Sequence, residues 1–325
     1  MRIVVLDGYT LNPGDLSWDE VAELGELTVY DRTALQDIVP RAREAQIVLI
    51  NKVPISADTL AQLPKLRFIA VTATGYDMVD VVAAGKRGIP VSNVPEYGTD
   101  SVAQFTFALI LELCHHVGMH DRAVKAGEWS LSPDWCFWKT HQHLLVGKKI
   151  GIVGFGRIGR RVGEIAHAFG MEVIAFDPCP GESPTYTPFH WKSLHEVFSE
   201  ADVVTLHCPQ TSENVGFVNA ELIKLMKREA FFINTARGGL VDEKALAEAL
   251  NDGKIAGAAV DVVSVEPIRP DNPLLQARNC LISPHMAWAS LSARRRLMAT
   301  TVENIRAFLS GTPANLVNES YLRDR

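Results

Sequence analysis

The chain has 325 residues, of which 47% are hydrophobic and 22% charged, and its formal net charge at pH 7 is −6. This length allows two compact domains, since single hydrophobic cores rarely grow beyond about 250–300 residues. The acidic balance argues against a general nucleic-acid or anionic-membrane surface. The five cysteines are scattered and form no CxxC pair, which argues against a disulfide framework or a structural zinc site.

The first residues lead directly into a strand-like segment, with no signal peptide before it. The apolar run 102–114 is too short to span a bilayer and contains Gln104 and Glu112, so we interpret it as a buried helix. We therefore expect a soluble protein of the cytoplasm.

The first hundred residues alternate short apolar segments with amphipathic ones. Strands are expected at residues 3–6, 47–50, 68–71 and around 91. Such alternation predicts parallel strands joined by helical crossovers. A long helix should follow, capped by Asp100 or Ser101 and running towards Gly127.

A second alternating series predicts another doubly wound sheet, because its strands are apolar throughout and so are buried on both faces. Its strands are expected at residues 150–153, 173–176, 203–206, 231–234, 258–261 and 281–283. Helices are expected at residues 158–169, 243–251 and 291–309.

The turn Gly154-Phe155-Gly156-Arg157-Ile158-Gly159 joins a predicted strand to a predicted helix. Gly154 permits a tight turn, Gly156 lets a diphosphate approach the backbone, and Gly159 lets the helix pack close to the sheet. Free N–H groups at the start of the helix then face the phosphates. The turn predicts a dinucleotide site.

An acidic residue, Asp177, ends the next predicted strand, about eighteen residues beyond Gly159. A carboxylate there accepts hydrogen bonds from the adenosine ribose and repels a 2′-phosphate. No arginine or lysine occurs in residues 178–181. The pattern favours NAD over NADP; the alternative is a structural turn with an incidental acid.

Three polar residues follow predicted strands at the edge where doubly wound sheets form their sites: Arg237, Glu266 and His285. Reduction of a 2-keto acid needs a cation for the substrate, an acid for the forming alkoxide and a group that orients this acid. The three residues suit these roles. Taken singly, each also has a structural interpretation: a surface ion pair, a loop residue or a packed histidine.

The chain resembles the D-2-hydroxyacid dehydrogenase family over nearly its whole length. The resemblance rests on residues 93–95, 99–103, the 154–159 turn, 234–242, 257–261 with 266–267, and 283–285. It implies an α/β fold of two doubly wound parallel-sheet domains, a flavodoxin-like substrate domain with an inserted Rossmann NAD-binding domain. The expected boundaries are 1–99 for the substrate domain, 100–288 for the NAD domain and 289–325 for a C-terminal helix that returns to the substrate domain.

The resemblance also assigns the site. It implies that Arg237 binds substrate and that His285 is the acid–base, oriented by Glu266. The backbone of Thr74 and Gly75 would hold the substrate carboxylate. Cofactor contacts are implied at Thr99, His207, Cys208, Pro209, Thr235, Ala236 and Asp261, the last at the nicotinamide carboxamide.

Two segments resemble hydroxypyruvate reductases, also called glycerate dehydrogenases: residues 286–290 and 132–140. By this resemblance Trp288 and Ser290 shape the pocket near a hydroxymethyl group, and Trp138 reaches the substrate pocket of the partner subunit. The alternative is that Trp138 and its neighbours only pack within a dimer interface. Both interpretations require a homodimer. Hydroxypyruvate, glyoxylate and larger 2-keto acids all stay open as substrates.

Two other classes of function compete with the reductase. One is a NAD-sensing interaction protein, since the C-terminal-binding-protein corepressors share this fold; the other is a dinucleotide enzyme of different chemistry, such as an amino-acid dehydrogenase. We expect no metal, although His115, His116 and His120 lie close together in sequence.

Overall fold

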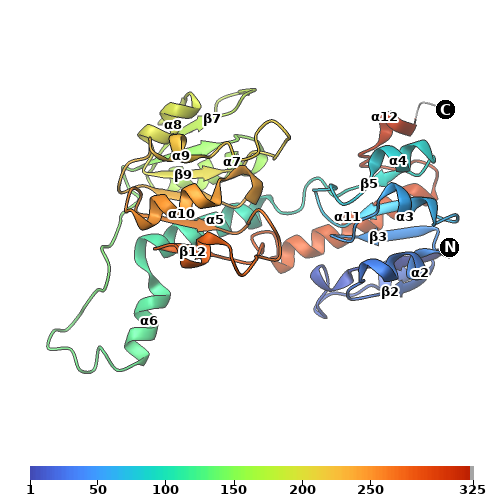
Figure 1. Cartoon of the computed structure of the whole chain (residues 1–325), viewed down its shortest axis with the longest axis horizontal. Coiled ribbons are helices and arrows are strands. Elements are labelled where there is room, and N and C mark those ends of the chain that lie inside the picture. The colour runs from blue at the N-terminus through green and yellow to red at the C-terminus, as the bar shows by residue number, and fades with distance from the viewer. Residues whose placement is uncertain (323–325) are drawn as a thin grey trace. The chain divides into compact units, whose positions relative to one another are not determined.

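A computed structural model describes residues 1–322 and divides the chain into two compact units (Figure 1). Unit 1 consists of residues 1–98 and the chain from residue 289 onward, and unit 2 consists of residues 99–288. The chain passes from unit 1 to unit 2 between residues 98 and 99 and returns between residues 288 and 289.

Unit 1 contains a five-stranded parallel sheet in the order β2-β1-β3-β4-β5. The strands are β1 (Arg2–Val5), β2 (Glu26–Val29), β3 (Ile47–Ile50), β4 (Phe68–Val71) and β5 (Val91–Ser92). Every residue of β3 and β4 is buried, which explains their purely apolar sequence. This order is the flavodoxin-like one, as expected.

Short helices and one long helix accompany this sheet. They are η1 (Gly8–Thr10), α1 (Asp19–Ala22), η2 (Leu35–Asp37), α2 (Ile38–Ala42), α3 (Ala57–Ala61), α4 (Val81–Lys86), α11 (Leu291–Leu309) and α12 (Glu319–Leu322). In α11 the ring of Phe308 stacks on Phe68 of β4, with centroids 4.5 Å apart. The late helix therefore packs against the first hundred residues.

Unit 2 contains a seven-stranded parallel sheet in the order β12-β11-β10-β9-β6-β7-β8. The strands are β6 (Lys149–Val153), β7 (Glu172–Phe176), β8 (Phe189–Trp191), β9 (Val203–Leu206), β10 (Phe231–Asn234), β11 (Gly257–Val260) and β12 (Cys280–Ile282). The chain reverses its winding direction between β6 and β9, and ligands of such sheets bind at the carboxyl edge near this point.

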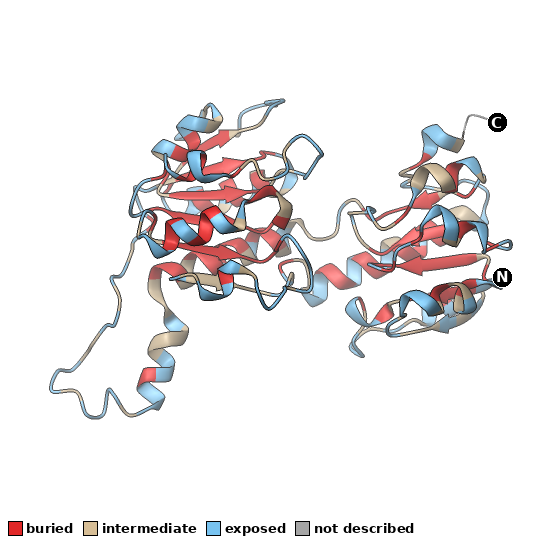
Figure 2. Cartoon of the chain, viewed as in Figure 1, coloured by how far each residue is buried: buried red, intermediate tan, exposed pale blue. Residues whose placement is uncertain are grey.

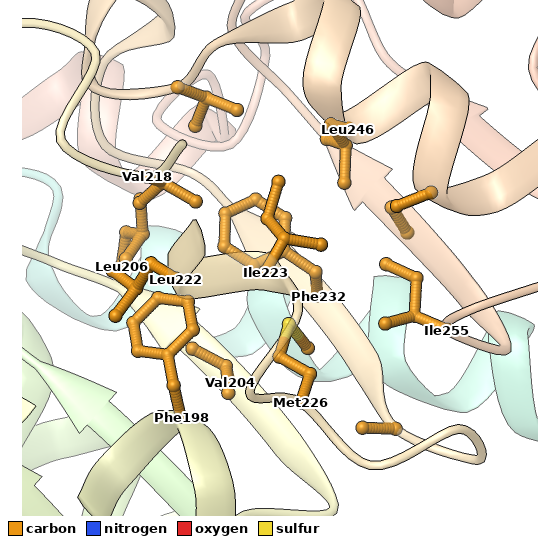
Figure 3. Packing of buried hydrophobic residues seen from close by; sticks show 14 of the residues in the cluster. Phe198, Val204, Leu206, Val218, Leu222, Ile223, Met226, Phe232, Leu246 and Ile255 are labelled. Carbon is orange, nitrogen blue, oxygen red and sulfur yellow. The ribbon is translucent and has the colours of Figure 1, made fainter. Parts of the chain in front are cut away.

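Helices cover both faces of the second sheet. The helices of unit 2 are α5 (Thr99–His115), α6 (Val117–Lys125), α7 (Arg157–Ala168), α8 (Leu194–Glu200), α9 (Ala220–Ile223), η3 (Gly238–Leu240), α10 (Glu243–Asn251) and η4 (Pro273–Gln276), and all but α6 lie close to the sheet. On one face Phe232 of β10 packs with Ile223 of α9 and Leu246 of α10 (Figure 3). On the other face α5 and α7 pack over β6 and β10. Both faces are therefore buried, as the apolar strands indicate.

The expected single helix from residue 100 to 127 is wrong, because the structure has two helices. His116 takes a left-handed conformation with φ of 45°, and α5 and α6 meet at a bend of 56°. Beyond the bend α6 leads away from the sheet (Figure 1), and only Ala123 of α6 is buried (Figure 2). No single helix within residues 1–322 is long and apolar enough to cross a membrane; α5 and α6 reach that length only as this bent pair.

Candidate active site

The glycine turn between β6 and α7 has the geometry of a dinucleotide cradle. Gly154 has a φ of +92°, and a Cβ there would lie 2.5 Å from the backbone nitrogen of Cys208. A Cβ on Gly159 would collide with the carbonyl of Gly154, whereas nothing lies within 4 Å of the Cβ position at Gly156. Gly156 is also the N-cap of α7 and has no side chain to satisfy the free N–H groups. The turn therefore fits a bound diphosphate.

Asp177 lies directly after β7 and contacts the same turn. Its Oδ2 accepts a hydrogen bond from the N–H of Phe155 at 2.9 Å, and its Oδ1 accepts one from the N–H of Cys179 at 3.0 Å. Each carboxylate oxygen can accept a second bond, so the group can still bind a ribose hydroxyl.

The loop after β9 forms a further wall of this region. The Nε2 of His207 hydrogen bonds with Oγ1 of Thr205 at 2.9 Å, and Cys208 lies against Gly154. Burial lowers the pKa of His207 to about 3 and raises the pKa of Cys208 to about 11. Both side chains are therefore neutral at physiological pH, so they can line this region but are not suited to acid–base chemistry. Pro209 follows them and is exposed.

Arg237 follows β10 in a turn that Asn234 holds. The buried Asn234 donates to the carbonyl of Arg237 at 2.9 Å and accepts from the N–H of Ala236 at 3.0 Å. The guanidinium of Arg237 is partly buried and donates through Nη1 to the carbonyl of Ala236 at 2.8 Å. The hydroxyl of Thr235 lies 3.1 Å from that of Thr106 in α5. Sequence reasoning missed Asn234 as an organiser of this turn.

Glu266 and His285 form a hydrogen-bonded pair. Nδ1 of His285 lies 2.6 Å from Oε2 of Glu266, and Oε1 of Glu266 accepts a bond from the N–H of Val263 at 3.3 Å. The His285 and Glu266 side chains are 28% and 34% exposed, so a ligand can reach them. A carboxylate only accepts hydrogen bonds, so Nδ1 carries the proton and Nε2 is the nitrogen that can exchange one.

Asp261, the first residue after β11, has internal partners. Its buried carboxylate accepts bonds from Oγ of Ser283 at 2.6 Å, from the N–H of Met286 at 3.0 Å and from the N–H of Ala287 at 2.8 Å. These bonds order the loop that carries His285. The expected contact of Asp261 with the nicotinamide stays a proposal, because the structure shows only this supporting role.

The remaining predicted residues lie on four other segments. In unit 1 the Thr74 hydroxyl donates to the carbonyl of Val94 at 2.8 Å beside Gly75, and Oγ of Ser290 accepts from the N–H of Ala293, capping α11. In unit 2 Trp288 donates through Nε1 to the carbonyl of His285, and Trp138 is 68% exposed on the segment after α6.

The two candidate caps of α5 have other roles. The helix begins at Thr99, so Asp100 and Ser101 lie inside its first turn. The Ser101 hydroxyl donates to the carbonyl of Ala287 at 2.7 Å, and Asp100 pairs with Arg161. The expected capping role of either residue is therefore wrong.

The three polar residues at strand ends lie on neighbouring strands. Arg237 follows β10, the Glu266 loop follows β11 and His285 follows β12, and these strands are adjacent in the sheet. Within residues 1–322, no group of three or more His, Cys, Asp or Glu side chains is arranged to hold a metal ion. The edge of the sheet thus offers a guanidinium, a histidine that is hydrogen bonded to a carboxylate and a glycine turn that fits a diphosphate, a set of groups that would suit hydride transfer to a carbonyl.

A family model described as "D-isomer specific 2-hydroxyacid dehydrogenase, NAD binding domain" matches residues 107–287. The chain belongs to this family. It is therefore an oxidoreductase, and unit 2 contains its nucleotide-binding domain.

Curated relatives and solved structures agree with this family. The chain is 49% identical to the hydroxypyruvate reductase of Blautia hydrogenotrophica, over 98% of this chain and 100% of the relative. It is 41% identical to the glycerate dehydrogenase of Methylorubrum extorquens, over 97% and 98% of the two chains. It also matches the NADPH-dependent glyoxylate/hydroxypyruvate reductase of Sinorhizobium meliloti solved with NADP and malonate, with a TM-score of 0.83, 28% identity and coverage of 100% and 98%. None of these relatives supports a corepressor.

Proposed function

We propose that this protein is an NAD(H)-dependent D-2-hydroxyacid dehydrogenase that interconverts hydroxypyruvate and D-glycerate, with glyoxylate and glycolate as a second substrate pair. The observation that carries the proposal is the bond between His285 and Glu266 on the sheet edge that also holds Arg237. The names of the two curated relatives favour hydroxypyruvate among the 2-keto acids.

We assign the proton transfer to His285. Its Nε2 would give a proton to the substrate oxygen as the carbonyl is reduced and would take it back in the reverse reaction. Glu266 would keep the ring in one orientation through its hydrogen bond with Nδ1. Arg237 would bind the substrate carboxylate and carbonyl through its planar guanidinium. A bound NADH supplies the hydride.

The cofactor assignment rests on the cradle and on Asp177. We propose that the nucleotide is held by Gly154, Phe155, Gly156, Arg157, Ile158, Gly159, Asp177, His207, Cys208, Pro209, Thr235, Ala236, Asp261 and Thr99. The preference for NAD over NADP is supported by the carboxylate of Asp177, which would repel a 2′-phosphate. Because the related enzyme of S. meliloti is NADPH-dependent, activity with NADH and with NADPH must be compared directly.

Unit 1 is our candidate for the substrate-binding domain. The backbone of Thr74 and Gly75 lies after β4 and is our candidate for the substrate carboxylate. We also propose that Trp288 and Ser290 line the substrate pocket. Trp288 would do so through its ring, since its N–H donates to the carbonyl of His285. Ser290 also caps α11.

The segment made of α6 and residues 126–146, which we name the arm, supports a homodimer. Five of its large apolar side chains are strongly exposed: Leu131 and Trp135 by 86% each, Leu144 by 76%, Val146 by 70% and Trp138 by 68%. An exposed apolar surface of this kind marks an interaction site. We propose that two copies pair through their arms and that Trp138 reaches the substrate pocket of the partner. We also propose a cytoplasmic location, because all five cysteines are free thiols, which suits a reducing compartment.

The decisive experiment is NADH oxidation measured with hydroxypyruvate, glyoxylate, pyruvate and phosphohydroxypyruvate. We expect the highest kcat/KM with hydroxypyruvate. A preference for pyruvate would refute the substrate assignment alone, whereas no turnover with any of the four would refute the proposed function.

A further inference from the structure

The backbone of His285 takes a conformation that non-glycine residues rarely adopt. Its φ is +53°, in the left-handed region. Such a conformation persists only where the surroundings enforce it. The placement of this imidazole therefore depends on groups that hold its backbone as well as on Glu266, which holds its ring.

Both backbone groups of His285 are engaged. Its N–H donates to the carbonyl of Asp261 at 2.7 Å, and its carbonyl accepts a hydrogen bond from the indole Nε1 of Trp288 at 3.0 Å. The first bond joins two main-chain groups. The second is made by a side chain three residues further along, so a substitution can remove it without touching the main chain.

The residues between His285 and Trp288 are also fixed. The N–H groups of Met286 and Ala287 donate to the carboxylate of Asp261, and the carbonyl of Ala287 accepts the hydroxyl of Ser101 in α5. Ala287 is 3% exposed. The main chain just before Trp288 is therefore held in place, and the Trp288 indole hydrogen bonds back to the carbonyl of His285.

An indole has one N–H and no acceptor, so this donor serves a single partner at a time. In the structure that partner is the carbonyl of His285. Trp288 can therefore act in two ways, through a contact of its ring with substrate or through support of the histidine by its N–H. These two roles predict different kinetics.

We propose that Trp288 is a positioning residue for the acid–base histidine, acting through the hydrogen bond from its indole N–H to the His285 carbonyl. The inference rests on the proposed function in one respect, namely that His285 exchanges a proton with the substrate.

The first test is Trp288→Phe, which keeps an aromatic ring and removes the N–H. We expect kcat to fall about fivefold, equivalent to about 1 kcal/mol, equally for hydroxypyruvate and glyoxylate and with little change in either KM. The matched control is Trp18→Phe, which makes the same exchange at the residue before α1 in unit 1, outside the candidate site residues and the arm. We expect kcat of this control to stay within about twofold of the wild type.

A double-mutant cycle tests the route through the histidine. In a His285→Gln background the acid–base group is gone, so adding Trp288→Phe should lower the remaining kcat no further. An additional fivefold loss would contradict the inference. So would an unchanged kcat with a KM that rises only for hydroxypyruvate in Trp288→Phe, since the contact of the ring with substrate would then be the only role of Trp288.

A measurement without substrate or cofactor separates this inference from the proposed function. We expect the imidazole NMR signals of His285 to shift in Trp288→Phe and to stay unchanged in Trp18→Phe; unchanged signals in both would overturn the inference. If Trp288→Phe does not fold, benzothienylalanine at position 288, which has the shape of tryptophan without its N–H, gives the same comparison. If the wild type turns over no 2-keto acid, the proposed function fails while the NMR comparison still decides the positioning role.

Discussion

Nδ1 of His285 donates a hydrogen bond to Oε2 of Glu266 across 2.6 Å, although the two residues stand nineteen positions apart in the chain. The loop after β11 and the turn after β12 bring them together, because these strands are neighbours in the sheet. A second oxygen of Glu266 accepts the N–H of Val263, so the carboxylate is itself oriented. Because Nδ1 is engaged by Glu266, Nε2 is the nitrogen to which we assign the proposed proton transfer.

The first prediction concerns His285, the proposed acid–base group, and Arg237, the proposed cation for the substrate. His285→Gln and Arg237→Ala should each lower kcat/KM for hydroxypyruvate reduction by at least about a hundredfold, since general acid catalysis and electrostatic stabilisation each have this magnitude. Steady-state NADH oxidation measures the loss. NADH affinity, measured by fluorescence titration, serves as the control and should change little in His285→Gln. Near-normal turnover in either variant would overturn its assignment.

The second prediction concerns cofactor choice. Asp177→Ala removes the carboxylate that would repel a 2′-phosphate, so the preference for NADH over NADPH should fall at least about tenfold, equivalent to about 1.4 kcal/mol. The ratio of kcat/KM for the two cofactors measures it. Glu182→Gln removes a charge from the same loop and should leave the ratio unchanged. A wild type that prefers NADPH would contradict the role of Asp177.

Both parallel sheets could be predicted from the sequence, because a strand buried on two faces needs an unbroken apolar run, as in β3, β9 and β10. The edge strands β2 and β8 were missed. None of their residues is fully buried, so their sequences show no such run. The break between α5 and α6 was missed as well, since it depends on the left-handed backbone of His116 rather than on the pattern of apolar residues.

The sequence predicted the polar residues of the candidate site but not the contacts that hold them. Motifs at strand ends indicated Arg237, Glu266 and His285, because parallel strands bring their carboxyl ends to one edge. The sequence could not show that Asn234 holds the turn of Arg237, or that the carboxylate of Asp261 points into its own loop. These contacts depend on side-chain direction, which only the folded chain defines.

The third prediction concerns the glycine that follows Arg237. A Cβ at Gly238 would collide with the backbone of Val263 and Ser264, so Gly238→Ala must displace either the Arg237 turn or the loop that leads to Glu266. We expect a loss of stability of about 1–3 kcal/mol, as for overpacking, together with a lower kcat/KM. Urea unfolding and NADH oxidation measure the two effects. Gly118→Ala, where a Cβ meets only ordinary contacts, should be neutral in both; equal behaviour of the two variants would contradict the prediction.

The fourth prediction concerns the arm. If two copies pair through it, the wild type should have twice the mass of the chain by light scattering. The double variant Leu131→Glu with Trp135→Glu should be monomeric, because it places charges on the apolar surface that a dimer would bury. Leu35→Glu is the matched control, since Leu35 is 70% exposed in unit 1 and should not affect assembly. A monomeric wild type, or a double variant that stays dimeric, would refute pairing through the arm.

The fifth prediction follows from the pKa of His207, which burial lowers to about 3. In the unfolded chain a histidine takes up a proton near its ordinary pKa of about 6.5. Between these two values the unfolded state binds a proton that the folded state does not bind, so stability falls as the pH falls. The contribution of His207 should reach about 1.4 kcal/mol for each pH unit below about 6.

His207→Gln tests this linkage, because glutamine can still hydrogen bond with Thr205 but does not titrate. The free energy of unfolding in urea, measured at pH 7, 6 and 5, should decrease less steeply with acidification in this variant than in the wild type. If His207→Gln and the wild type lose stability at the same rate, the imidazole of His207 is protonated in the folded protein and the argument from burial is wrong.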